Sequence, residues 1–498
     1  MTFDIVSGTT HGLADTESFV ALLNGSPGRV ELSSGLPEHP LHEGGAFFRP
    51  RREVVVTRAP GRLDLMGGIA DYSGALVLEL PTSAATHAAL QIVEDDALTV
   101  VSLSTDLASA PRRYEMSLAE FVRDGSPVSY EEARARFASD AESRWAAYVM
   151  GAFLVLMRER GCVFERGARL LVRSDVPEGK GVSSSAALEV AIMRAVAAAY
   201  RLEMSPRETA FLCQRVENMV AGAPCGVMDQ MTAACGEEGR LLALLCQPCE
   251  ARGYVTLPPE LSVWGVDSGV RHSVGGADYA TVRTAAFMGY RMIADFEGLR
   301  AVDGGAGSRL TIEDPKWHGY LANISPAEFE KCYAPLLPER VSGAEFLARY
   351  RGITDQITSV EPARIYPVLA ATRHPVREHA RVVEFAEALR DWRDPAQAER
   401  LGELMYESHA SYSACGLGSD ATDEFVRLVR EEGTVHGLYG AKITGGGSGG
   451  TVAVLARSDA GDAVAKVAAG YAASAGVSSF VLGGSSPGAC RFGHLVLR

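Results

Sequence analysis

The chain has 498 residues, a formal net charge of −14, 47% hydrophobic residues and 22% charged residues. A chain of this length exceeds what one compact core usually supports, so two lobes are expected. The negative net charge argues against sequence-independent binding of nucleic-acid phosphates, and no nucleic-acid partner is predicted.

Two further features bear on where the protein works. The first residues, MTFDIVSGTTHG, have neither a basic start nor an apolar core, so no signal peptide is predicted. The longest apolar run, residues 146–157, has 12 residues and is too short to span a bilayer. We therefore expect a cytoplasmic protein with no membrane partner.

Nine cysteines are scattered along the chain. An odd number in a chain of this kind predicts reduced thiols rather than a disulfide framework. Cys246 and Cys249 form an isolated CxxC pair, whereas a zinc site would need a second pair or nearby histidines. No transition-metal site is predicted.

In chain order, residues 1–50 are rich in Gly, Pro, Ser and His and are expected to form an N-terminal extension, with a short helix around residues 16–25. Strand-like and helical runs then alternate over residues 51–255 and again over residues 256–498. Residues 296–365 have the irregular, polar character of an insertion. The pattern predicts an α+β fold with two lobes.

The first informative stretch is RLDLMGGIADYSGALVLELP, residues 62–81. It places Arg62, Asp64 and Asp71 in a glycine-rich turn between two apolar, strand-like runs. Such a dense set of charges between strands is either a ligand site or a set of pairs across the turn, for example between Arg62 and Asp64.

The second stretch is DVPEGKGVSSSAALEV, residues 175–190. A probable strand ends at Pro177, Gly179 and Gly181 permit positive φ, and a serine run opens an apolar helix. A glycine-rich turn before a helix N-terminus favours anion binding. The alternative is a serine cap on a core helix, since the GxxxxGK[ST] phosphate-loop pattern is absent.

Two later stretches complete the set. Asp229 lies in ENMVAGAPCGVMDQ, residues 217–230, where an unpaired carboxylate would be costly, so it either caps a turn or takes part in chemistry. Residues 442–455, KITGGGSGGTVAVL, place five glycines around Ser448 before a strand and are expected to form a second loop closing on a ligand.

These four stretches, in this order, resemble the GHMP superfamily of small-molecule kinases, and most closely its galactokinase branch. The segments MGGIADYSG, GAPCGVMDQMTAACGE and SYSACGLGSDATD are most similar to the kinase domain of the arabinokinases within that branch. The resemblance begins near Arg58 and continues to the end of the chain. It implies a two-lobed α+β GHMP kinase fold, with ATP and a monosaccharide meeting in the cleft between the lobes.

The resemblance also implies roles for individual residues. Asp229 corresponds to the catalytic aspartate that accepts the proton of the sugar hydroxyl, and Arg62 to the arginine that holds it. Ser185 and Glu217 correspond to Mg²⁺ ligands, hard oxygens suited to that ion. Asp71 and Tyr279 correspond to sugar contacts, although Tyr279 as an interface aromatic is the alternative. The ATP phosphates would be cradled by Gly179, Gly181, Ser183, Ser184 and Ser185.

The substrate prediction depends on a departure from the pattern. Galactokinases read GEHTDY where this chain reads GGIADY, so Gly68 and Ile69 replace a glutamate and a histidine that serve the C6 hydroxyl of galactose. Ile69 could fill the vacated space. L-Arabinose has the same ring configuration without C6, so we predict an ATP-dependent kinase that forms L-arabinose 1-phosphate. The alternatives are a galactokinase, another monosaccharide 1-kinase, or a sugar sensor without activity.

Overall fold

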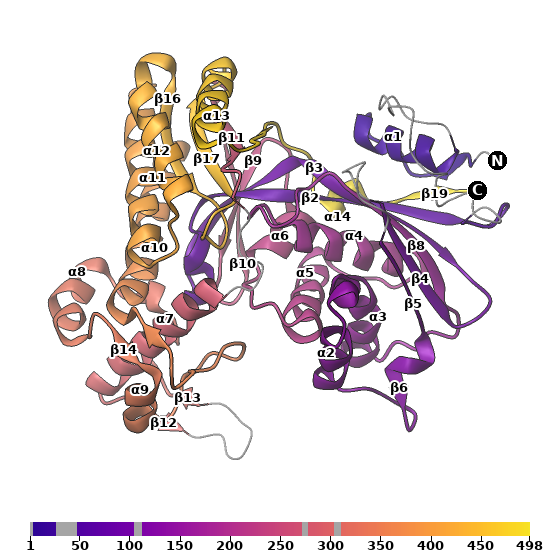
Figure 1. Cartoon of the computed structure of the whole chain (residues 1–498), viewed down its shortest axis with the longest axis horizontal. Coiled ribbons are helices and arrows are strands. Elements are labelled where there is room, and N and C mark those ends of the chain that lie inside the picture. The colour runs from indigo at the N-terminus through magenta and orange to yellow at the C-terminus, as the bar shows by residue number, and fades with distance from the viewer. Residues whose placement is uncertain (1–2, 26–46, 104–111, 271–276, 303–309) are drawn as a thin grey trace.

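The computed structural model describes residues 3–25, 47–103, 112–270, 277–302 and 310–498, with helices and strands arranged around two sheets. The larger sheet has nine strands, and the smaller one has four (Figure 1). This arrangement confirms the predicted α+β class. Among the described residues, no helix is long and apolar enough to cross a membrane.

The larger sheet is antiparallel except for the pairing of β4 with β8. Its central path, in spatial order, is β1 (Ile5–Ser7), β19 (Leu495–Leu497), β2 (Val54–Met66), β3 (Leu76–Ile92), β8 (Ala168–Ser174), β4 (Ala97–Leu103) and β5 (Arg112–Ser117). Two further strands extend from β3, namely β9 (Arg240–Leu245) and β10 (Glu250–Thr256). The first and last strands of the chain therefore lie side by side in one sheet.

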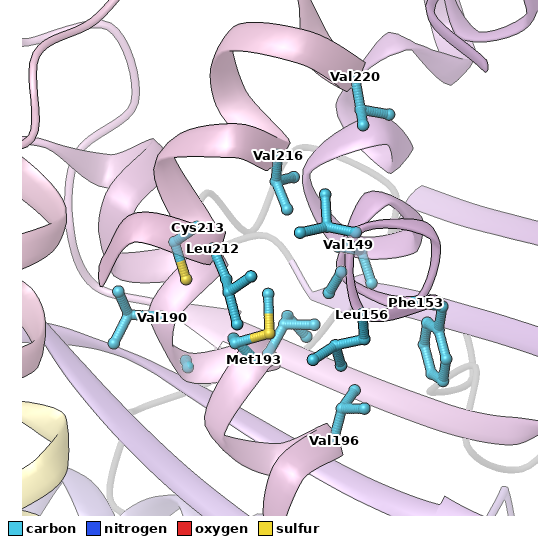
Figure 2. Close-up of a cluster of buried hydrophobic side chains, with 14 of the residues drawn as sticks. Val149, Phe153, Leu156, Val190, Met193, Val196, Leu212, Cys213, Val216 and Val220 are labelled. Atoms are coloured by element: carbon cyan, nitrogen blue, oxygen red, sulfur yellow. The ribbon is translucent and has the colours of Figure 1, made fainter. Parts of the chain in front are cut away.

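Helices accompany this sheet, with α4 (Ser184–Ala199) packed against β2 and β3 and α6 (Met228–Cys235) packed against β2. They are α2 (Tyr130–Ala138), α3 (Ala147–Arg160), α4 (Ser184–Ala199), α5 (Pro206–Arg215), the π-helical turn η4 (Val216–Ala221), α6 (Met228–Cys235) and the short α14 (Ala489–Phe492). Figure 2 shows Val149 and Leu156 of α3 and Met193 of α4 pointing toward one another and toward Leu212 of α5. This core fixes the start of α4, where the predicted phosphate loop ends.

The smaller sheet is entirely antiparallel and consists, in spatial order, of β16 (Leu438–Ile443), β17 (Thr451–Arg457), β11 (Leu261–Asp267) and β18 (Val481–Leu482). The long helices that accompany it are α7 (Ala277–Phe296), α10 (Val368–Arg390), α11 (Gln397–Ala414), α12 (Asp420–Glu432) and α13 (Gly461–Ala475). Leu63 and Leu65 of β2 share a buried cluster with Leu401 and Leu455. The two halves are therefore packed on each other through β2, the strand that carries Arg62.

Between α7 and α10 the described residues form only short elements, as expected of an insertion. They are β12 (Ala301–Val302), β13 (Thr311–Ile312), η5 (Leu321–Asn323), α8 (Pro326–Glu328), η6 (Phe329–Tyr333), η7 (Ala334–Leu336), β14 (Val341–Ser342), α9 (Gly343–Tyr350) and β15 (Ile365–Tyr366). In the larger-sheet half, a two-strand pair is formed by β6 (Val122–Arg123) and β7 (Ser126–Pro127).

The described part of the N-terminal extension is attached to the larger sheet. Its helix, α1 (Ala14–Leu23), matches the expected short helix, and Phe19 stacks on His87 of β3 at 5.0 Å between ring centroids. Asp15 forms an ion pair with Arg58 of β2 at 2.8 Å. The boundaries near residues 50 and 255 remain a prediction. All nine cysteines are free thiols in this structure.

Candidate active site

Arg62, near the middle of β2, is a buried arginine that contacts three separate parts of the site. Its Nε and Nη2 donate to Asp229 Oδ1 at 3.0 and 2.7 Å, and its Nη1 donates to the Gly181 carbonyl at 2.7 Å. Glu79 of β3 lies on the other side, with Oε2 at 3.2 Å from Nε. Arg62 thus joins the predicted catalytic acid to the predicted phosphate loop.

The charges around Arg62 reinforce its cationic state. Burial alone would lower the pKa of Arg62, but Asp229 and Glu79 raise it well above its usual range. Burial raises the pKa of Glu79 well above its ordinary value, and the nearby Asp64 adds to the rise. The hydrogen bonds to Asp229 and to the Gly181 carbonyl therefore hold a charged guanidinium in place, whereas the burial of Glu79 favours its neutral form.

The predicted phosphate loop has the positive φ angles that its glycines predict. Gly179 and Gly181 have φ of 69° and 70°, and Ser183 adopts the left-handed conformation at φ 61° immediately before α4. The Ser183 hydroxyl oxygen is buried and has no hydrogen-bond partner in the described structure. Ser184 and Ser185 form the first turn of α4, whose N–H groups are free to meet an anion.

The third glycine-rich stretch packs against this loop, backbone to backbone. A Cβ atom at residue 445 would stand 2.5 Å from the Gly181 carbonyl oxygen, and one at residue 450 would stand 2.7 Å from the Lys180 carbonyl oxygen. The Lys180 carbonyl also accepts a hydrogen bond from the Thr451 N–H at 2.9 Å. Glycine is required here because only a chain without side chains allows this approach. The two loops therefore lie together, as predicted.

Glu217 lies in the π-helical turn η4 and is buried, and the nearby Ser185 hydroxyl favours the charged form of its carboxylate. Gln230 Nε2 donates to Glu217 Oε2 at 2.6 Å and to Glu189 Oε2 at 3.2 Å. Burial raises the pKa of Glu217 to about 7, and the nearby Asp229 contributes. A cation at this carboxylate would offset both effects.

This donor set fits Mg²⁺. Ser185 and Glu217 offer a hydroxyl and a carboxylate oxygen, and Mg²⁺ in kinase sites typically takes one or two protein oxygens together with water and substrate phosphates. Among the described residues, no group of three or more His, Cys, Asp or Glu side chains is gathered as a metal cage. The arrangement suits an ion that arrives with a nucleotide.

Asp71 lies in the 3₁₀ turn η1 (Gly68–Ser73), and its carboxylate is pressed against Gly226. A Cβ atom at residue 226 would overlap Asp71 Oδ2, so glycine is required there. Burial raises the pKa of Asp71 to about 7, with Arg283 opposing the rise and Asp229 adding to it. Burial raises the pKa of Tyr279 well above its ordinary value, and the nearby Asp71 adds to the rise. The predicted sugar contacts and the predicted base therefore lie close together.

Arg283 of α7 is a further buried cation on the Asp71 side. Its Nε and Nη2 donate to the two carboxylate oxygens of Asp355 at 2.8 Å each, and its Nη1 donates to the Cys225 carbonyl at 3.1 Å. Its guanidinium lies 5.4 Å from the centroid of the Tyr72 ring, next to Asp71 in the sequence. Asp355, near the end of the insertion, therefore helps to fix this wall of the site.

Gly68 is enclosed by protein. A Cβ atom at this position would overlap the hydroxyl oxygen of Tyr412, a buried residue of α11. Ile69 is buried in the same apolar cluster as Tyr412. The space beside Gly68 is therefore filled by the Tyr412 hydroxyl, and the expectation that Ile69 fills it is corrected accordingly.

Asp64, for which the sequence predicts no role, forms an ion pair with Lys442 of β16. Lys442 Nζ lies 2.5 Å from Asp64 Oδ2, and both side chains are fully buried. The alternative that Asp64 pairs with Arg62 is wrong, because Arg62 pairs with Asp229 and Glu79.

The structure brings together Arg62, Asp229, Gly181, Ser185 and Glu217 through the contacts above, and it places Asp71 beside them. Sequence reasoning missed Glu79, Arg283, Tyr412 and Lys442. A glutamate inside the apolar run LVLELP and a lysine before the apolar run of β17 were signals of buried charges that need partners. Arg283 and Tyr412 had no comparable signal.

Known proteins are similar to both halves of this chain. The GHMP kinases N terminal domain matches residues 147–237, and the GHMP kinases C terminal domain matches residues 385–473. An L-arabinokinase from Arabidopsis thaliana is 43% identical over 543 aligned residues, which cover 100% of this chain and 52% of that protein. The chain thus spans about half the length of that relative. A galactokinase from Chloroflexus aggregans is 29% identical, over 86% of this chain and 90% of its own.

Among solved structures, Lactococcus lactis galactokinase complexed with galactose matches with a TM-score of 0.66 at 20% identity, covering 87% of this chain and 94% of that chain. At that identity the likeness shows a shared fold. Both kinase domains occur in their family order, and the identity to an L-arabinokinase extends over the whole chain. The chain therefore contains both the N-terminal and the C-terminal domain of the GHMP kinases.

Proposed function

We propose that this chain is an ATP-dependent sugar 1-kinase that phosphorylates the anomeric hydroxyl of L-arabinose and releases L-arabinose 1-phosphate. The observation that carries the proposal is the Arg62 guanidinium, which bonds both Asp229 and the Gly181 carbonyl of the phosphate loop. It links a candidate base to a candidate phosphate site at hydrogen-bond distance. The 43% identity to an L-arabinokinase supports the choice of reaction.

In this proposal Asp229 accepts the proton of the attacking anomeric hydroxyl, and Arg62 orients Asp229 while its charge faces the transferred phosphoryl group. ATP supplies that group, and Mg²⁺ neutralises its charge when bound. Ser185 and Glu217 would hold the ion. Gly179, Gly181, Ser183 and Ser184 would bind the phosphates through N–H and O–H groups. Phosphoryl transfer needs little beyond such positioning and charge neutralisation.

The proposed preference for L-arabinose depends on the wall of the site near Gly68. The Tyr412 hydroxyl occupies the space beside Gly68, so no polar side chain can extend from that residue toward a C6 hydroxyl. A hydroxyl buried without a partner costs on the order of 1–3 kcal/mol, about tenfold to a hundredfold in affinity. L-Arabinopyranose lacks C6 and keeps its contacts to Asp71 and Tyr279. D-Galactose is the second candidate, because galactokinases are also similar to this chain.

We further propose that the enzyme acts in the cytoplasm, where thiols stay reduced; the nine free cysteines are compatible with this placement.

The decisive experiment offers the purified chain Mg²⁺·ATP with L-arabinose, D-galactose or glucuronic acid, measures ADP release, and identifies products by NMR. We expect L-arabinose 1-phosphate and a kcat/KM for L-arabinose at least tenfold above that for D-galactose. A preference for D-galactose would overturn the substrate, leaving a galactokinase. Sugar binding without ADP release would overturn the enzyme and leave a sugar sensor.

A further inference from the structure

The turn that follows β2 is held by an unusual set of side chains. Three consecutive backbone N–H groups each donate to a different buried side chain: Gly67 to Glu378 at 3.2 Å, Gly68 to Asp64 at 2.9 Å and Ile69 to Tyr412 at 3.0 Å. Glu378 and Tyr412 belong to α10 and α11, helices that accompany the smaller sheet. The smaller-sheet half of the molecule therefore fixes the turn that leads to Asp71.

The Tyr412 hydroxyl also reaches the third glycine-rich loop. It accepts from the Ile69 N–H and donates to the Gly445 carbonyl at 3.1 Å. Gly445 is the residue whose Cβ, if present, would stand 2.5 Å from the Gly181 carbonyl oxygen and 3.3 Å from Arg62 Nη2. A single hydroxyl thus connects the Asp71 turn with the loops near Arg62.

The ring of Tyr412 is itself fixed in place. His374 packs on it edge to face at 5.2 Å between ring centroids, and Lys442 Nζ lies 5.1 Å from its centroid. Asp64 Oδ2 lies 3.4 Å from the hydroxyl and 2.5 Å from Lys442 Nζ. A buried aromatic ring held on several sides keeps its hydroxyl at one position, which is what a positioning group requires.

We propose that Tyr412 is a positioning residue whose hydroxyl couples the sugar-binding turn to the third glycine-rich loop, so that sugar and ATP sites are set by one side chain. This rests on the proposed function, which assigns Asp71 to the sugar and the phosphate loop to ATP. The proposal also explains Gly68, because the hydroxyl can reach the Ile69 N–H only where residue 68 has no side chain.

The test compares Tyr412→Phe with a matched control, Tyr406→Phe. Tyr406 lies in the same helix but packs in another cluster, where the Arg430 guanidinium carbon lies 4.6 Å from the centroid of its ring. Tyr412→Phe keeps the ring but leaves the Ile69 N–H and the Gly445 carbonyl without their partner. We expect KM for the sugar to rise about tenfold and kcat to fall severalfold, since a buried group has lost its bond. Tyr406→Phe should match the unsubstituted protein.

A second readout needs no substrate. Hydrogen exchange measured on peptides covering residues 66–73 and 442–450 should speed up in both segments in Tyr412→Phe and in neither segment in Tyr406→Phe. Faster exchange in one segment only, or in neither, would overturn the coupling. If the unsubstituted protein phosphorylates no sugar, the proposed function fails while the exchange result still decides whether Tyr412 couples the two segments.

A double-mutant cycle tests the contact between residue 68 and the Tyr412 hydroxyl. Gly68→Ala places a Cβ on the Tyr412 hydroxyl, so it should be severely damaging alone and less damaging when combined with Tyr412→Phe. Fully additive losses in thermal midpoint would contradict the proposal.

Discussion

One carboxylate oxygen of Asp229 receives two hydrogen bonds from Arg62, at 3.0 Å from Nε and 2.7 Å from Nη2. Both fall on Oδ1, so Arg62 orients the carboxylate without engaging its second oxygen. The same guanidinium bonds the Gly181 carbonyl at 2.7 Å. The proposed proton acceptor is thereby held at a fixed position relative to the proposed phosphate loop, and this relationship underlies the first prediction.

Asp229→Asn should abolish turnover while ATP binding persists. The amide keeps an oxygen for Arg62 but cannot take a proton, so kcat should fall by at least the roughly 10²-fold typical of a lost general base. Steady-state ADP release and calorimetric titration with a non-hydrolysable ATP analogue provide the two readouts. A near-normal kcat would mean that Asp229 is structural.

Glu217→Gln should raise the Mg²⁺ concentration needed for half-maximal activity by about tenfold or more and lower kcat. The amide keeps the shape and can still contact Ser185 and Gln230, but it offers the ion no negative charge. Titrating activity against Mg²⁺ at saturating ATP checks this. An unchanged Mg²⁺ dependence would remove Glu217 from the metal site.

The first two predictions use residues that could be identified from the sequence, and there is a physical reason for this. Positive φ at Gly179 and Gly181, the start of α4, and the acid at residue 229 are local features that neighbouring residues specify. The partners of Arg62 and Asp64 could not be predicted in the same way. Lys442 is nearly 380 residues from Asp64 and meets it only because β16 and β2 pack together. For the same reason the pairing of Arg62 with Asp64, plausible from spacing, was wrong.

Sugar binding should strengthen as pH rises through about 7. Burial raises the pKa of Asp71 to about 7, against Arg283 and with help from Asp229, so the carboxylate is increasingly protonated below that pH. A protonated Asp71 accepts fewer hydrogen bonds from sugar hydroxyls, and affinity should fall about tenfold per pH unit below 7. Measuring sugar binding without ATP or Mg²⁺ keeps metal binding at Glu217, whose pKa is also raised to about 7, out of the readout. Asp71→Asn should bind weakly at every pH, and a pH step that survives this substitution would contradict the assignment.

The raised pKa of Asp71 also makes the stability of the protein depend on pH. The folded pKa of Asp71 lies above its unfolded value of about 3.8, so the folded protein binds more protons between these two pH values. The free energy of unfolding contributed by Asp71 therefore falls as pH rises from about 4 to about 7 and is constant above that. Chemical denaturation of Asp71→Asn at several pH values should show a flatter profile over this window than the unsubstituted protein. An identical slope in both proteins would mean that Asp71 does not titrate there.

Lys442→Met should destabilise the fold strongly. Both Lys442 and Asp64 are fully buried, and removing the ammonium leaves a buried carboxylate without its partner, which costs about 3–5 kcal/mol. Lys466→Met is the control, because Lys466 is 70% exposed and its ion pair with Glu432 is screened by solvent, so its loss should change stability little. Urea denaturation midpoints give the comparison. Equal midpoints for the two variants would show that the buried pair has no structural role.

Gly226→Ala should impair sugar binding while leaving ATP binding intact. The added Cβ would overlap Asp71 Oδ2, and since Asp71 is buried its carboxylate must move away from the position it now holds. We expect KM for the sugar to rise at least tenfold, because displacing one hydrogen-bonding group by about an ångström is costly in a preorganised site.

Gly470→Ala in α13 is the matched control, because outside the helix's own backbone no atom lies within 4 Å of its Cβ position. Since alanine favours helix, this variant should leave the kinetics unchanged and stabilise the protein by up to about 1 kcal/mol. Steady-state kinetics with the sugar and ATP varied in turn separate the two sites. If Gly226→Ala raised KM for ATP and left that for the sugar unchanged, Asp71 would belong to the nucleotide side of the active site.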